Sequence, residues 1–90
     1  MAGSAGGGDS SHRSLTDIRK GRECRIVSLP NDPIRRSQCI RLGIHEGEVI
    51  ACLERLPGAT MVVQIRRQEI ALGRDLASDI VVEMHVGENR

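Results

Sequence analysis

The 90-residue sequence contains no Phe, Tyr or Trp. Domains that stack unpaired nucleic-acid bases depend on aromatic rings, as do cages for methylated lysine and grooves for proline-rich peptides. The absence of aromatic side chains excludes these modes of recognition. A formal net charge of only +1 is also low for strong nucleic-acid binding, so we expect no nucleic-acid partner.

Long apolar runs and targeting segments are missing as well. The uncharged apolar stretches fall far short of the roughly 18 residues that a membrane-spanning helix needs. The N-terminal sequence has neither the apolar core of a signal peptide nor the arginine pattern of a transit peptide. These absences predict a cytoplasmic protein with no membrane span of its own.

The three cysteines, Cys24, Cys39 and Cys52, are an odd number and show no CxxC spacing. This pattern argues against a disulfide framework and against closely spaced metal-ligand pairs. Free cysteines pack as small hydrophobic residues. We therefore expect three reduced thiols in the core.

A chain of this length forms one domain. Residues 1–13 are rich in Gly and Ser and predict a flexible tail, residues 14–83 carry the folded pattern, and residues 84–90 read as a polar C-terminal tail. Charge is uneven, because residues 13–41 carry a net +5 and residues 42–90 a net −3, with Asp9 supplying the remaining −1. A basic region of the surface would favour an acidic partner or anionic lipid headgroups, and the alternative is an ordinary solvated face.

The first predicted strand covers residues 24–29 and is followed by a helix. Asp32 is a good N-cap, Pro33 suits the first helical position, and Gly43 is expected just after the helix C-terminus. The spacing of Cys39 and Leu42 places both on the inner face of this helix.

Further strands are expected over residues 49–53, 61–65, 69–72 and 80–83, because each run is apolar or alternating and is bounded by turn residues. A loop at 56–59 separates two of them, and a short helical turn within 74–79 would place Ala77 and Ile80 inward. The pattern predicts a mainly β protein: a compact β-barrel with one helix after the first strand and a helical turn before the last.

Several segments match a known family as a set. They are Leu15, Ile18, Gly21, Cys24 and Ile26, then Cys39-Ile40-Arg41-Leu42-Gly43-Ile44, Gly47, Glu69-Ile70-Ala71-Leu72, Ala77 and Ile80-Val81-Val82. Over residues 14–83 the chain resembles the FeoA family. The resemblance implies an SH3-like β-barrel. It also implies an accessory role in bacterial Fe²⁺ uptake, exercised on a membrane permease that carries a cytosolic GTPase domain.

The chain departs from the family at a tight hairpin, where Arg66 and Arg67 stand in place of the usual Gly. A two-residue type I′ turn needs positive φ at both central residues, which Arg67 and Gln68 do not favour. We expect a longer or strained loop from which Arg66 and Arg67 project outward. The three cysteines also stand where family members usually have aliphatic or small residues, and we expect them to thin the core further.

A metal site is only weakly indicated. The sequence from His45 to Val49 begins like a HExxH motif but lacks the second His. His45 with Glu46 or Glu48 could hold Fe²⁺ or another divalent transition metal weakly through imidazole and carboxylate, and the alternative is a plain solvated turn. No catalytic constellation and no phosphate-binding glycine loop is present, so we expect no enzyme activity and no resident cofactor.

A protein-binding surface is the remaining prediction. Its candidate residues are Arg35, Arg36, Leu56, Pro57, Arg66 and Arg67, since arginine is enriched at interfaces and loops of small barrels bind partners; the alternative is that they serve solubility. Three functions stay open: an accessory of the iron permease, a direct iron carrier or sensor, and a regulatory module for another GTPase or a transcription factor. Open strand edges would also permit a homo-oligomer.

Overall fold

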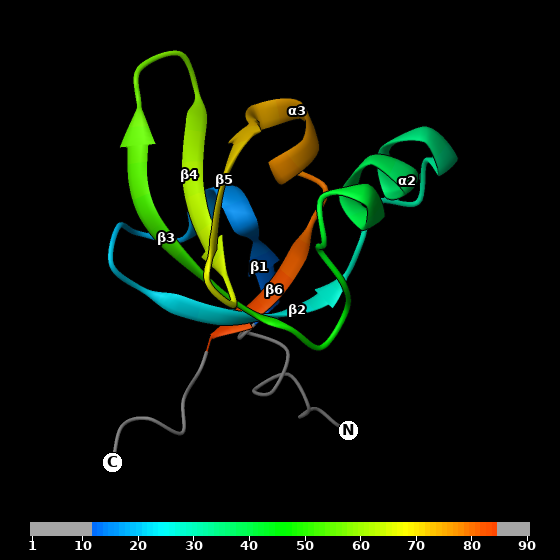
Figure 1. Ribbon diagram of the computed structural model, residues 1–90, viewed down its shortest axis with the longest axis horizontal. Coiled ribbons are helices and arrows are strands. Elements are labelled where there is room, and N and C mark those ends of the chain that lie inside the picture. Colours follow the sequence, from blue (N-terminus) through cyan, green and yellow to red (C-terminus); the bar gives the residue numbers. More distant parts are fainter. Residues whose placement is uncertain (1–11, 85–90) are drawn as a thin grey trace, which may run out of the picture.

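A six-stranded antiparallel sheet forms most of the computed structural model, which describes residues 12–84 (Figure 1). The strands are β1 (His12–Ser14), β2 (Glu23–Ser28), β3 (Val49–Leu56), β4 (Thr60–Ile65), β5 (Gln68–Gly73) and β6 (Val81–Met84). Three short helices complete the described chain: the 3₁₀ helix η1 (Leu15–Asp17), α2 (Pro33–Arg41) and α3 (Arg74–Ala77). The strand order is β1-β6-β2-β3-β4-β5. The predicted mainly β class, with a helix after the first long strand and a helical turn before the last strand, is confirmed.

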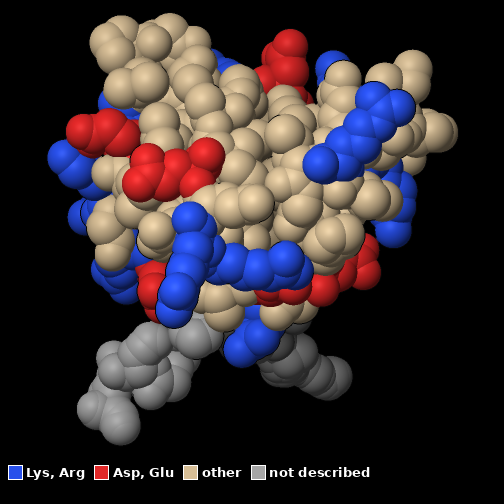
Figure 2. Space-filling model, viewed as in Figure 1, with Lys and Arg blue, Asp and Glu red and all other residues tan. Residues whose placement is uncertain are grey.

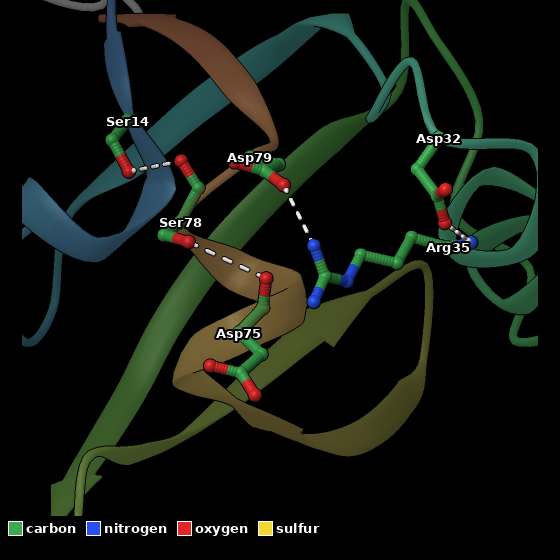
Figure 3. Close-up of polar contacts among 6 residues, drawn as sticks. All are labelled: Ser14, Asp32, Arg35, Asp75, Ser78 and Asp79. Carbon is green, nitrogen blue, oxygen red and sulfur yellow. Dashed lines mark hydrogen bonds and ion pairs between the residues drawn. The ribbon is translucent and has the colours of Figure 1, made fainter.

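The sheet curls but does not close through strand pairing. In the described chain β1 and β5 are its two edges, and η1 and α3 lie between them (Figure 1). The Leu15 amide donates to the Ile80 carbonyl at 2.9 Å, and Ser14 Oγ donates to the Ser78 carbonyl at 3.0 Å (Figure 3). The expected barrel is therefore partly open, and helical segments cover the gap that a further pairing would fill.

Alternating side chains build the core as the sequence predicted. Met61, Val63 and Ile65 of β4 all point inward. Ile50 and Cys52 of β3 are buried as well and lie on the inner face of the sheet. Ala77 and Ile80 are fully buried. The three cysteines are free and buried, and no polar or charged residue of the described chain is buried. The barrel interior is thus aliphatic and sulfur-containing throughout.

Helix α2 begins and ends where its local signals predict. Asp32 Oδ2 accepts a hydrogen bond from the Arg35 amide at 3.0 Å, and Gly43 has φ +88° just after the helix. The prediction for Leu42 is wrong, because its side chain is 38% exposed. The left-handed Gly43 reverses the chain there, so that Ile44, which is fully buried, enters the core in its place.

The folded domain begins earlier than expected. His12 and Arg13, assigned to the tail by composition, lie in β1, which pairs antiparallel with β6. At the other end β6 extends through Met84, one residue into the expected C-terminal tail. The rest of both predicted tails, residues 1–11 and 85–90, lies outside the described residues. None of the described helices is long and apolar enough to cross a membrane.

Candidate functional site

The six predicted partner-binding residues do not form one surface. Leu56 and Pro57 lie at the tip of the β3–β4 hairpin, whereas Arg66 and Arg67 form the β4–β5 turn. Strand β4 separates the two turns, which lie at opposite ends of it in Figure 1. The candidate surface therefore divides into a hairpin tip and a second region around α2 and the β4–β5 turn.

Arginines of the second region meet the residues that were predicted as metal ligands. Arg66 Nη2 lies 2.9 Å from Glu48 Oε2, and Arg36 Nη2 lies 3.7 Å from Glu46 Oε2. We name these four residues the charged cluster. It joins α2 and the β4–β5 turn to the loop before β3, so three separate segments form one charged surface.

Electrostatics within the charged cluster favour the ionised carboxylate. The hydrogen bond from Arg66 is the main cause of a lowered pKa for Glu48, and the Arg66 charge and His45 add to it. Glu48 in turn raises the pKa of Arg66. A metal ion at Glu46 or Glu48 would have to displace an arginine, and no three metal-ligating side chains of residues 12–84 converge on one point. Weak metal binding by His45, Glu46 and Glu48 stays a prediction.

The β4–β5 turn is tighter than the sequence predicted. Ile65 pairs directly with Gln68, so the loop has two central residues, Arg66 and Arg67, and the expectation of Arg67 and Gln68 at these positions is wrong. Arg66 has φ +60°, a region that costs a non-glycine residue about 1–2 kcal/mol. The expected strain is present, and it falls on the residue whose side chain reaches Glu48.

Helix α2 presents apolar side chains to solvent. Ile34 is 70% exposed and Ile40 is 46% exposed, and Cys39 is the only residue of the helix that is buried. Arg35 Nη1 lies 3.5 Å from Asp79 Oδ2, which links α2 to the segment after α3 (Figure 3). Figure 2 shows Lys and Arg side chains over the region of α2, which stands to one side of the sheet in Figure 1. The sequence made no prediction for Ile34 and Ile40, because the spacing of residues placed only Cys39 and Leu42 on the inner face of this helix.

The thiols are poor nucleophiles in this setting. Burial raises the pKa of Cys24 to about 12, with smaller contributions from Cys52 and Glu23. Burial also raises the pKa of Cys39 and Cys52. All three are therefore thiols at neutral pH, in agreement with their predicted role as packing residues.

Two hollows of about 270 Å³ each flank η1. Arg55, Arg74 and Asp17 supply the charged lining of one. Three arginines, Arg13, Arg19 and Arg22, line the other together with Asp17. The sequence signal for the second hollow was the basic excess of residues 13–41, which could not be assigned to a place before the fold was known.

A family model for the FeoA domain matches residues 13–84, which is nearly the whole described chain. The chain belongs to the FeoA family. No curated protein matches its sequence. The family assignment therefore depends on the domain match, and the solved structures that are similar show the fold.

Solved structures share the fold of this FeoA-family chain. The FeoA-like protein of Clostridium acetobutylicum matches with a TM-score of 0.78 at 18% identity, over 89% of this chain and 94% of that one. Stenotrophomonas maltophilia FeoA, solved with zinc and described as a prokaryotic SH3 domain protein, matches at 0.68 and 20%, over 78% and 88%. A manganese-dependent transcriptional repressor matches at 0.77 and 22%, over 82% of this chain but 42% of its own length. The predicted SH3-like fold is confirmed.

Proposed function

We propose that this FeoA-family protein is a cytoplasmic, non-enzymatic accessory of ferrous-iron uptake that binds the cytosolic GTPase domain of an iron permease. The FeoA domain match over residues 13–84 carries this proposal. The S. maltophilia relative, which shares the fold, is described as a candidate ferrous iron transport activating factor. Every buried side chain of the described domain is apolar. The polar and charged groups that could bind a partner therefore lie on its surface.

Helix α2 and the charged cluster are the surface we assign to the partner. Exposed isoleucine next to arginine is the composition of an interface, in which apolar anchors are surrounded by residues that pair with carboxylates. Ile34 gains from burial against a partner because 70% of its surface is exposed in the free domain. Arg36 and Arg66 can exchange their exposed intramolecular partners for acidic groups of the GTPase domain at little cost.

Calorimetric titration of the full chain into the GTPase domain, with and without guanine nucleotide, tests the proposal. Ile34→Asp should abolish or strongly weaken binding without unfolding the domain, since the side chain is largely exposed. Leu56→Asp is the matched control: Leu56 is 43% exposed but lies at the hairpin tip, and this variant should bind as the wild type does. Absence of binding in every nucleotide state would contradict the function. Loss with Leu56→Asp alone would move the surface to the hairpin tip.

A further inference from the structure

Three arginines line one hollow beside η1. Arg13, Arg19 and Arg22 line it, Ile18 and Met84 supply its apolar part, and Asp17 is its single acid. None of the three arginines makes an ion pair within residues 12–84. Elsewhere in the same range Lys20, Arg35, Arg36 and Arg66 each face a carboxylate. The lining of the hollow therefore has an excess of positive charge, which Asp17 offsets only in part.

The backbone holds these arginines in place. Arg13 lies in β1, opposite Val82 of β6. Arg19 and Arg22 are the first and last residues of a tight turn, closed by the Arg22 amide donating to the Arg19 carbonyl at 3.1 Å. Gly21 within the turn has φ +86°, and its amide donates to the Cys52 carbonyl at 2.7 Å. Because the turn is hydrogen-bonded to β3, the backbone of Arg19 and of Arg22 is held in place beside the hollow.

We propose that this hollow binds a phosphate group, carried either by a small soluble phosphate or by a lipid headgroup. Guanidinium groups donate paired hydrogen bonds to phosphate oxygens, and a tetrahedral phosphate can offer oxygens to several arginines at once. Binding would also relieve the mutual repulsion of the three cations. Asp17 opposes the anion and limits its affinity.

Pyrophosphate and vesicles distinguish the two sources. The full chain is titrated at low ionic strength with pyrophosphate and, separately, with vesicles of phosphatidylglycerol in phosphatidylcholine or of phosphatidylcholine alone. The Gly21 amide and the arginine Nε–H signals report binding by NMR, which suits a protein without Trp or Tyr. Saturable shifts with pyrophosphate indicate a small soluble phosphate. Binding only to vesicles that contain phosphatidylglycerol indicates a headgroup.

Single substitutions test whether the hollow is the site. Arg19→Gln and Arg22→Gln should each weaken binding about two- to fivefold, the range expected for an exposed ion pair, and Asp17→Asn should strengthen it by a similar factor. Arg41→Gln makes the same change in net charge on α2 and should leave the affinity unchanged. The proposal is overturned if neither probe binds, if Asp17→Asn fails to strengthen binding, or if Arg41→Gln weakens it as much as Arg19→Gln does.

Discussion

Arg66 adopts a left-handed backbone conformation, with φ +60°, and its Nη2 atom lies 2.9 Å from Oε2 of Glu48. A strained turn residue thereby connects the β4–β5 turn to the loop before β3. The same loop is tied to α2 by Arg36 and Glu46. Arg66 thus has both a strained backbone and an ion pair of the charged cluster. The contribution of each to stability can be measured separately.

Substitution of Arg66 separates the strain from the ion pair. Arg66→Ala and Arg66→Gly both remove the ion pair, but only glycine relieves the positive φ. We expect Arg66→Gly to be more stable than Arg66→Ala by about 0.5–1 kcal/mol, after allowance for the greater freedom of glycine in the unfolded chain. Urea unfolding followed by far-UV circular dichroism measures this difference. Equal stability, or a more stable alanine variant, would show that the turn is unstrained.

Glu48 makes stability depend on pH in a defined direction. Its folded pKa lies below the ordinary value of 4.5, chiefly because of the hydrogen bond from Arg66. A group with a lowered folded pKa contributes stability that is fully present above the unfolded pKa. This contribution is lost as the pH falls from 4.5 through the lower folded value. NMR titration of the Glu48 carboxyl should show a midpoint below 4.5 that rises toward it in Arg66→Ala. An unchanged midpoint in the variant would refute the coupling.

The three thiols should resist alkylation in the folded protein. Cys24, Cys39 and Cys52 are each almost completely buried, and the pKa of Cys24 is about 12, so reactive thiolate is scarce. Iodoacetamide followed by mass spectrometry should find no labelled cysteine under native conditions and three labels in urea. Rapid native labelling of one cysteine would reveal an accessible nucleophile and would count against a purely structural role.

Weak metal binding at His45, Glu46 and Glu48 can be tested through the arginine that competes for it. Anaerobic addition of Fe²⁺, a paramagnetic ion, should broaden the NMR signals of residues 45–48. Arg66→Ala should enhance the broadening because it frees the Glu48 carboxylate, and His45→Ala should abolish it. Broadening that is strongest elsewhere, or that persists in His45→Ala, would exclude this loop as the site.

Local signals were sufficient to predict most elements. Asp32, Pro33 and Gly43 mark the ends of α2 without help from the rest of the chain, and the alternation of Met61, Val63 and Ile65 identifies both β4 and its buried face. Strand β1 was missed because His12, Arg13 and Ser14 show no apolar alternation. Its existence depends on pairing with β6, nearly 70 positions later in the sequence.

The site was less predictable because its contacts form between separate elements. Arginine at positions 36 and 66 could be recognised as a candidate for binding, but not as a partner of Glu46 and Glu48, since those pairs arise only when α2 and the β4–β5 turn fold against one loop. Leu56 and Arg66 were likewise predicted to belong to one binding surface, although they lie at opposite ends of β4. The sequence thus identified the residue types of the surface, and the fold determined which of them lie together.

The most direct test of the proposed function is an NMR map of the full-length protein with the permease GTPase domain, in the presence and absence of guanine nucleotide. Amide signals of residues 34–42 and of the Arg66–Arg67 turn should shift saturably, and higher salt should weaken the effect because charged groups take part. Shifts confined to the hairpin tip around Leu56 would contradict the assigned surface. No shifts in any nucleotide state would contradict the accessory function itself.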